Sequence, residues 1–283
     1  MSSLHEREYQ VIRKLVFERS RINLGPDKKE LVAVRVNKRL RQLRLDSYAD
    51  YCKLLTASDG EDELKDLVDV ISTNFTNFFR ERSHFDFLRA TALPRFTAGA
   101  KAPIKRLRVW SAACSSGEEP YSIAIVLADF FSGKDGWQWQ VEAADISTRM
   151  LAKARCGIYE AARVILPNPG WLRRYFRKGV DSYAGYYRVK AELRGAVRFH
   201  HLNLFQPDYP FAPGLHAIFC RNVMIYFDRA TQEQLVNRLA DYLLPGGYLF
   251  VGHAESLISI NHPLDGIEPS VYQKPDRQHG RLQ

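Results

Sequence analysis

The sequence has few cysteines and no long apolar run, and these two absences argue against several classes of protein. Four of its 283 residues are cysteines, and no two of them form a C-x-x-C pair, which argues against a zinc cluster and a disulfide framework. No apolar stretch approaches the roughly 20 residues that a membrane-spanning helix needs. Charged residues interrupt the first 20 positions, where a secretory signal needs a continuous apolar segment. We therefore expect a cytoplasmic protein with reduced thiols.

The sequence also has too few acidic residues to balance its basic ones. Its 41 lysines and arginines stand against 32 aspartates and glutamates, which gives a net charge of +9. A basic balance favours an acidic partner. Nucleic acid, an anionic membrane and an acidic protein surface all meet this description, so the charge alone does not choose among them.

The N-terminal part of the chain contains no convincing strand. Apolar residues recur at helical spacing within residues 5–19, 28–45 and 61–71. We therefore predict an all-α domain over residues 1–85, followed by a linker over residues 86–106.

From residue 107 the pattern changes to short apolar runs that alternate with helical stretches. Such alternation predicts a parallel sheet with helices on both faces, which is a doubly wound α/β fold. We assign residues 107–274 to this domain and expect a flexible tail over residues 275–283. Within the domain, glycines and prolines separate short aromatic stretches over residues 166–196, which predicts a small inserted antiparallel β-subdomain. The parallel strands are expected at residues 107–110, 139–144, 197–201, 215–220 and 248–252.

A loop of small residues follows the first expected strand, and it ends in Ser115-Ser116-Gly117-Glu118-Glu119. Such a loop at the carboxyl end of a strand lets a ligand approach the backbone. It is neither a G-x-G-x-x-G fingerprint nor a P-loop, which needs a lysine. Because the two glutamates would repel a pyrophosphate, the loop favours a ligand with hydroxyls, an ammonium or a sulfonium, such as S-adenosylmethionine. An ordinary strand-to-helix turn with a capping acid is the alternative.

Asp145 ends the second expected strand. An acid at this position can accept hydrogen bonds from the hydroxyls of a ribose, although an aspartate here can also cap the following helix. The loop and Asp145 together favour a site for an adenosine group.

Several segments, in consistent order over residues 70–256, together resemble the chemotaxis receptor methyltransferase (CheR) family. They are Asn74-Phe75-Thr76-Asn77-Phe78-Phe79-Arg80, the small-residue loop through Ser122, Ala144-Asp145-Ile146, Asn203-Leu204, Phe219-Cys220-Arg221-Asn222-Val223-Met224-Ile225-Tyr226-Phe227, and Gly252-His253-Ala254-Glu255-Ser256. The resemblance implies an N-terminal helical domain and an S-adenosylmethionine-dependent methyltransferase domain with an inserted β-subdomain. It also implies methylation of receptor glutamates to methyl esters, with S-adenosylhomocysteine as the second product.

The resemblance further assigns individual residues. The family's cofactor contacts correspond to Asn74, Thr76, Arg80, Glu118, Asp145, Asn203, Leu204, Arg221 and Asn222. Arg80 and Tyr226 correspond to positions that line the methyl-transfer centre. We expect Phe75, Phe78 and Phe79 to pack inward and to leave the polar residues between them facing a pocket. No metal is implied, and the sequence offers no convincing set of histidine ligands.

Membrane receptors are the implied partners, and a monomeric protein recruited to receptor arrays without membrane insertion is expected. Five basic residues of the second helix would face the acidic, methylatable helices of a receptor: Arg35, Lys38, Arg39, Arg41 and Arg44. A receptor C-terminal peptide would add to the exposed sheet edge of the inserted subdomain near Gly185. A solvated basic surface and purely structural aromatics are the respective alternatives.

Two other functions remain open at this stage. A methyltransferase acting on nucleic acid would suit the positive charge, but Arg221-Asn222-Val223-Met224 stands where an Asn-Pro-Pro-Tyr type of segment would be expected. A non-catalytic, receptor-binding adaptor that has kept the fold is the second alternative.

Overall fold

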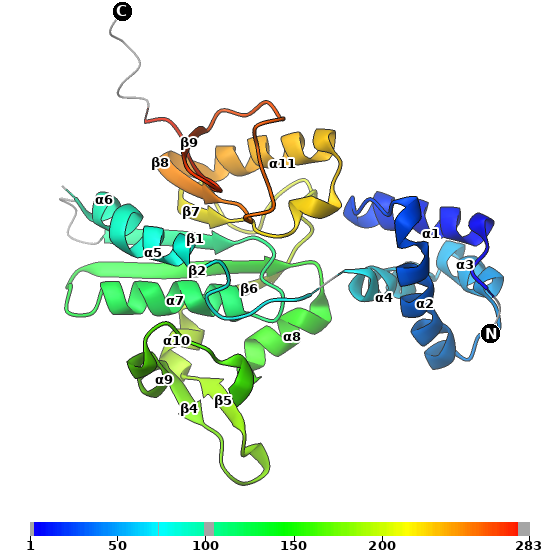
Figure 1. The fold of residues 1–283 in the computed structure, drawn as a ribbon, viewed down its shortest axis with the longest axis horizontal. Coiled ribbons are helices and arrows are strands. Elements are labelled where there is room, and N and C mark those ends of the chain that lie inside the picture. Colours follow the sequence, from blue (N-terminus) through cyan, green and yellow to red (C-terminus); the bar gives the residue numbers. More distant parts are fainter. Residues whose placement is uncertain (1–2, 73, 99–104, 277–283) are drawn as a thin grey trace, which may run out of the picture. The chain divides into compact units, whose positions relative to one another are not determined.

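The computed structural model describes residues 3–72, 74–98 and 105–276, which form two compact units. The chain divides between residues 73 and 74, and residues 226–231 return to the first unit. Each unit is described separately below (Figure 1). Among the described helices, none is both long and apolar enough to cross a membrane.

The first unit is helical, as predicted. Its helices are α1 (Glu6–Ser20), the 3-10 turn η1 (Pro26–Lys28), α2 (Lys29–Leu43), α3 (Tyr48–Thr56) and α4 (Glu61–Ile71). Residues at helical spacing on each helix are fully buried, for example Ile12 of α1 and Val36 of α2, so these amphipathic faces make the core. Helix α3 was not predicted, although Ser47 caps it by accepting a hydrogen bond from the amide of Asp50 at 3.1 Å.

The second unit is built on a seven-stranded sheet in the order β6-β2-β1-β7-β8-β10-β9. The strands are β1 (Lys105–Ser111), β2 (Trp137–Asp145), β6 (Val197–His201), β7 (Leu215–Phe219), β8 (Leu243–Phe250), β9 (Asp265–Glu268) and β10 (Val271–Gln273). The first five are parallel, which confirms the predicted doubly wound sheet. The β9–β10 hairpin extends it in antiparallel fashion at the β8 edge and was not predicted.

Helices α7 (Glu118–Phe130), α8 (Thr148–Cys156) and α11 (Arg229–Tyr242) connect the parallel strands, and Figure 1 shows α7 and α11 against the sheet. The apolar face of α7 is fully buried through Ile123 and Leu127, which lie in one hydrophobic cluster with Leu107 and Val109 of β1. The carboxyl ends of the parallel strands lie together at one edge of the sheet. In folds of this kind, ligands bind at that edge.

The predicted antiparallel insertion is present as a separate three-stranded sheet of order β3-β5-β4. Its strands are β3 (Ile158–Glu160), β4 (Phe176–Lys178) and β5 (Tyr186–Val189), accompanied by α9 (Pro169–Tyr175) and α10 (Ala191–Gly195). It begins at residue 158 rather than 166, because β3 has three residues and is too short for its alternation to be recognised in the sequence.

The range of the predicted linker, residues 86–106, is described over residues 86–98 and 105–106, where it is mostly helical and then begins β1. Helix α5 (Ser83–Phe87), a π-helical segment η2 (Leu88–Ala92) and α6 (Leu93–Thr97) follow one another without a break. Phe85, Leu88 and Leu93 are buried in the core of the second unit. The segment is helical because these apolar residues recur at helical spacing, so the first unit ends well before residue 85. The predicted tail over residues 275–283 lies almost entirely outside the described residues.

Candidate functional site

The loop between β1 and α7 is fixed from both sides. Gly117 is in the left-handed region, with a φ of 97°, and caps α7. A Cβ atom at this position would lie 2.9 Å from both the Cβ atom of Ala154 and the hydroxyl of Tyr159, so only glycine fits. The same Tyr159 hydroxyl donates to the carbonyl of Ser116 at 2.8 Å. A small-residue loop is therefore held rigidly at the carboxyl end of β1.

Asp145 joins this loop to the end of β2. Its carboxylate accepts hydrogen bonds from the amide of Ser115 at 2.7 Å and from the amide of Ser147 at 2.9 Å. The N-cap of α8 is Ser147, whose hydroxyl accepts from the amide of Met150, so the capping alternative for Asp145 is not adopted. A buried carboxylate thus lies between two loops at the edge of the sheet where the parallel strands end.

Glu118 points toward the inserted subdomain. Its carboxylate is fully buried and accepts from the hydroxyl of Ser116 at 2.7 Å and from Nη2 of Arg163 at 2.6 Å. Burial raises the pKa of Glu118, while the Ser116 hydroxyl and the Arg163 charge oppose that rise. Arg163 was not predicted as a site residue, because no local pattern links it to a loop more than 40 positions earlier.

Two further predicted residues lie at the same loop. The carbonyl of Asn74 accepts from the hydroxyl of Ser115 at 3.2 Å, and the carbonyl of Thr76 accepts from Nη2 of Arg163 at 3.3 Å. Asn74, Glu118 and Asp145 therefore converge on one loop, and Thr76 is linked to it through Arg163, although these residues come from distant parts of the sequence.

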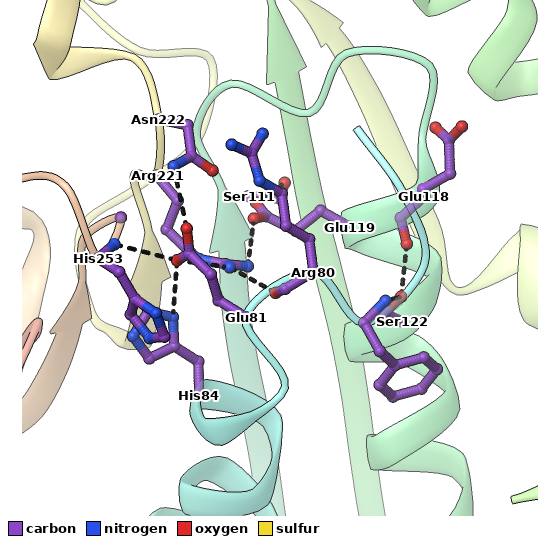
Figure 2. Close-up of polar contacts among 12 residues, drawn as sticks. Arg80, Glu81, His84, Ser111, Glu118, Glu119, Ser122, Arg221, Asn222 and His253 are labelled. Carbon is purple, nitrogen blue, oxygen red and sulfur yellow. Dashed lines mark hydrogen bonds and ion pairs between the residues drawn. The ribbon is translucent and has the colours of Figure 1, made fainter. Parts of the chain in front are cut away.

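Arg221, at the carboxyl end of β7, is the centre of a buried ion-pair network (Figure 2). Its side chain is 1% exposed; Nη1 lies 3.0 Å from the Glu119 carboxylate and Nη2 lies 2.9 Å from that of Glu81. Nη2 also donates to the carbonyl of Arg80. The network therefore fixes the backbone at Arg80 against α7 and the end of β7.

The two carboxylates of this network respond differently to burial. Burial raises the pKa of Glu119, and Arg221 and the Ser111 hydroxyl oppose that rise. Burial also acts to raise the pKa of Glu81, but hydrogen bonds from Arg221 and Asn222 outweigh it and lower the pKa to about 2. Glu81 was missed in the sequence, since a lone acid carries no recognisable pattern. Glu119 was noticed only as part of the loop, and its pairing with Arg221 was not predicted.

The segment of residues 74–80, which contains three aromatic residues, differs from expectation at one of them. Phe78 and Phe79 are buried as expected, but Phe75 is 72% exposed, so its predicted inward packing is wrong. The guanidinium of Arg80 donates to the Phe75 carbonyl at 2.9 Å and lies 5.7 Å from the Phe75 ring centroid. Residues 74–77 form neither helix nor strand, so no regular periodicity directs the three aromatic side chains to one face.

The predicted residues after β6 lie next to Asp145. The amide of Leu202 donates to the carbonyl of Asp145 at 3.0 Å. The side-chain oxygen of Asn203 accepts from the amide of Phe205 at 3.0 Å, and the carbonyl of Leu204 accepts from the hydroxyl of Tyr209 at 2.6 Å. Asn203 and Leu204 are therefore held in a turn at the same edge of the sheet.

Tyr226 ends the 3-10 turn η5 (Met224–Tyr226) and belongs to the first unit. There its carbonyl accepts from the amide of Asn23 at 2.8 Å. A shared methyl-transfer centre of Arg80 and Tyr226 remains a prediction.

The predicted basic face of α2 is smaller than expected. Arg39 is mostly buried and forms ion pairs with Glu63 and Asp66 of α4 at 2.5 and 2.7 Å. Arg35 donates to the carbonyl of Ile71, the last residue of α4. Both arginines therefore tie α2 to α4, because these helices bury their contact face. The remaining basic residues of the predicted face, Lys38, Arg41 and Arg44, are exposed.

Gly185 lies in the turn before β5, with a φ of 86° and nothing within 4 Å of where a Cβ atom would be. Beside this turn, a hollow of about 290 Å³ is lined by residues that include Lys178, Val180, Tyr183 and Tyr186. Val180 and Tyr183 are among the most exposed large apolar side chains of the described residues.

One group of side chains has ligand-type atoms close together. Atoms of Glu81, His84 and His253 lie within 4.8 Å of one another. Glu81 already accepts from Arg221 and from the amide of His253 at 3.2 Å, so a cation there would face a guanidinium. We therefore assign no metal to this group.

Comparison with known protein families gives a match for each unit. Residues 7–72 match the family described as "CheR methyltransferase, all-alpha domain", and residues 74–272 match "CheR methyltransferase, SAM binding domain". The two ranges divide the chain at the boundary between the two structural units.

Individual relatives cover nearly the whole chain. The chemotaxis protein methyltransferase of Salmonella typhimurium is 40% identical over 258 residues, which are 91% of this chain and 86% of that protein. The chemotaxis protein methyltransferase of Escherichia coli is 40% identical over 254 residues, which are 90% of this chain and 86% of that protein. A solved structure of magnesium protoporphyrin IX methyltransferase from Synechocystis has a TM-score of 0.35 at 13% identity over 78% of this chain and 91% of that one, which is too distant to support a functional argument.

Proposed function

Since this chain belongs to the CheR methyltransferase family, we propose that it transfers a methyl group from S-adenosylmethionine to glutamate side chains of chemotaxis receptors. The observation that carries this proposal is the convergence of Asn74, Glu118 and Asp145 on the rigid loop after β1. The relatives described above are named as chemotaxis methyltransferases, and neither supports the nucleic-acid or adaptor alternatives.

The residues at the loop fit this cofactor. Carboxylates and carbonyls at the sheet edge accept hydrogen bonds, which suits ribose hydroxyls and an ammonium group rather than phosphates. Asp145 would hold the ribose, and Asn74, Thr76, Glu118, Asn203, Leu204, Arg221 and Asn222 would surround the rest of the ligand. Bound S-adenosylmethionine supplies an electrophilic methyl group on a sulfonium.

The reaction needs alignment rather than a base. A substrate glutamate has a pKa of about 4.3 and is already ionised at neutral pH. Its oxygen attacks the methyl carbon, the carbon–sulfur bond breaks and its electron pair stays on sulfur, so an ester and a thioether form without proton transfer. Arg80 would orient the carboxylate by a charge-assisted hydrogen bond, and Tyr226 would donate a second one.

The receptor would be recognised at two places. Lys38, Arg41 and Arg44 present exposed positive charge to acidic receptor helices. At the insertion, β3 and β4 are the edge strands, and an extended receptor tail would add to an edge with its side chains in the hollow beside Gly185. We infer that a monomer works in the cytoplasm and is recruited to receptor arrays in this way.

Transfer of labelled methyl groups to receptor-containing membranes tests the proposal. We expect base-labile label on the receptor with the wild-type protein, and at least a hundredfold lower rate with Arg80→Ala. Label that resists mild base, or that appears on nucleic acid, would contradict glutamate methylation.

A further inference from the structure

The segment Gly252-His253-Ala254-Glu255-Ser256 matches the family resemblance but has no part in the function proposed above. It begins two residues after the end of β8. The neighbouring strand β7 leads into a loop that contains Arg221 and Asn222. The segment therefore lies beside the loop that carries these two predicted site residues.

Glu255 binds this loop through its backbone. Its Oε2 atom accepts from the amides of Gly252 at 2.6 Å and Asn222 at 2.9 Å. Its Oε1 atom accepts from the amides of Met224 at 2.7 Å and Ile225 at 3.3 Å. The side chain is 7% exposed, so these four amides replace the water that a carboxylate needs when it is buried.

Gly252 makes this approach sterically possible. A Cβ atom there would lie 2.5 Å from Nδ2 of Asn222 and 2.8 Å from Oε2 of Glu255. Both distances are shorter than real Cβ atoms tolerate. A glycine is therefore required by the closeness of the two loops.

Asn222 is held from its other side as well. Its side-chain nitrogen donates to Glu81 at 3.1 Å, and its backbone is left-handed, with a φ of 58°. An asparagine tolerates this conformation, but a single residue rarely keeps it without outside support. Figure 2 shows Asn222 directed toward Glu81 next to Arg221.

We propose that Glu255 is a positioning residue for the cofactor site: its carboxylate fixes the loop of residues 222–225 and thereby the orientation of Arg221 and Asn222. The proposal rests on the function proposed above. A carboxylate suits this task because it offers only acceptors, whereas a glutamine would turn an NH₂ group toward backbone donors. Its charge, and not only its shape, is what the loop requires.

Glu255→Gln tests the proposal, with Glu233→Gln as the matched control. Glu233 also accepts from a backbone amide, that of Asn261 at 3.0 Å, but lies outside the predicted site. For Glu255→Gln we expect calorimetry to show at least tenfold weaker binding of S-adenosylhomocysteine. We also expect at least a tenfold lower kcat with an unchanged KM for the receptor. The control should match the wild type in all three quantities.

Circular dichroism shows whether the variant is folded, and wild-type affinity in folded Glu255→Gln would overturn the proposal. If that variant does not fold, Gly252→Ala decides, because it keeps the carboxylate and presses on Asn222. The same loss of affinity supports positioning, and unchanged affinity refutes it. The binding of S-adenosylhomocysteine is measured without a receptor. If the wild-type protein failed to methylate receptors, the proposed function would be wrong, and the binding measurement would still test the role of Glu255.

Discussion

Arg163 of the insertion donates a 2.6 Å hydrogen bond to the buried carboxylate of Glu118, so the inserted subdomain is joined directly to the predicted cofactor loop. Arg163 opposes the rise in the pKa of Glu118 that burial causes. Removing this charge moves the pKa further upward.

The first prediction concerns this pair. Arg163→Gln should weaken binding of S-adenosylhomocysteine by about 1 kcal/mol, and the deficit should grow as the pH falls, because Glu118 then becomes protonated at higher pH than in the wild type. Calorimetry at several pH values measures both effects. Arg155→Gln is the control, since Arg155 is an exposed arginine that donates to the Phe199 carbonyl. A loss of affinity that does not change with pH would show that the charge of Glu118 does not contribute to ligand binding.

The second prediction concerns Asp145. Asp145→Ala should weaken cofactor binding by about 1–3 kcal/mol, because the ribose hydroxyls lose a charged acceptor. Since Asp145 also holds the amide of Ser115, a ligand without ribose hydroxyls separates the two roles. The wild type should lose affinity for that analogue and the variant should not. Equal losses for both proteins would remove Asp145 from the ribose site.

The third prediction separates two arginines of α2. Arg39→Glu should lower the free energy of unfolding by about 2–4 kcal/mol, because it breaks a largely buried ion pair with Glu63. Arg41→Glu should leave stability nearly unchanged and raise the KM for the receptor, with a smaller effect at high salt. Urea unfolding and methylation kinetics measure the two properties. A KM that does not depend on salt would argue against an electrostatic receptor face.

The fourth prediction concerns pH and His84. Burial, with a contribution from Arg221, lowers the pKa of His84 to about 3, from 6.5 when unperturbed. The folded state therefore favours neutral imidazole, and its contribution to stability is complete above pH 6.5 and is lost as the pH falls toward 3. Between pH 6 and 5 the wild type should lose about 1 kcal/mol relative to His84→Leu. Urea unfolding of both proteins at each pH measures this difference, and a constant difference would contradict it.

The fifth prediction concerns the insertion. Gly185→Val should abolish binding of a receptor C-terminal peptide and leave cofactor binding intact, because a β-branched residue cannot keep the left-handed turn beside the hollow. Gly133→Val is a matched control, since Gly133 has a φ of 74° and equally open surroundings. Calorimetry with tail peptides of the organism's own receptors is the measurement. Loss of peptide binding in both variants would point to general strain instead.

The sequence was sufficient to predict the parallel strands, because alternation of apolar runs with amphipathic helices is a local pattern. It was also sufficient to predict that Asp145 lies next to the loop before Glu118, since strand ends meet at one edge of a parallel sheet. Phe75 was misjudged because residues 74–77 form neither helix nor strand. In such a segment no periodicity in the sequence indicates which aromatic side chains are buried.

The partners of the site residues could not be predicted in the same way. Arg163 pairs with Glu118, and Arg221 pairs with Glu81, across 45 and 140 positions of the chain. Pairs at such separation follow from the packing of whole elements, and no spacing rule along the chain encodes them. The same holds for Arg39. Its positive charge was expected to face a receptor, but it is paired with two carboxylates of α4.

The first unit is completed by residues 226–231, which come after most of the second unit has been made. Its helices are synthesised first. The carbonyl of Tyr226, which accepts a hydrogen bond from the amide of Asn23, is synthesised about 200 residues later. The N-terminal helices of the nascent chain therefore stay unfinished until residue 231 has emerged. The unit that is encoded first is thus completed only after most of the second unit has been synthesised, and a fragment that stops at residue 72 lacks residues 226–231.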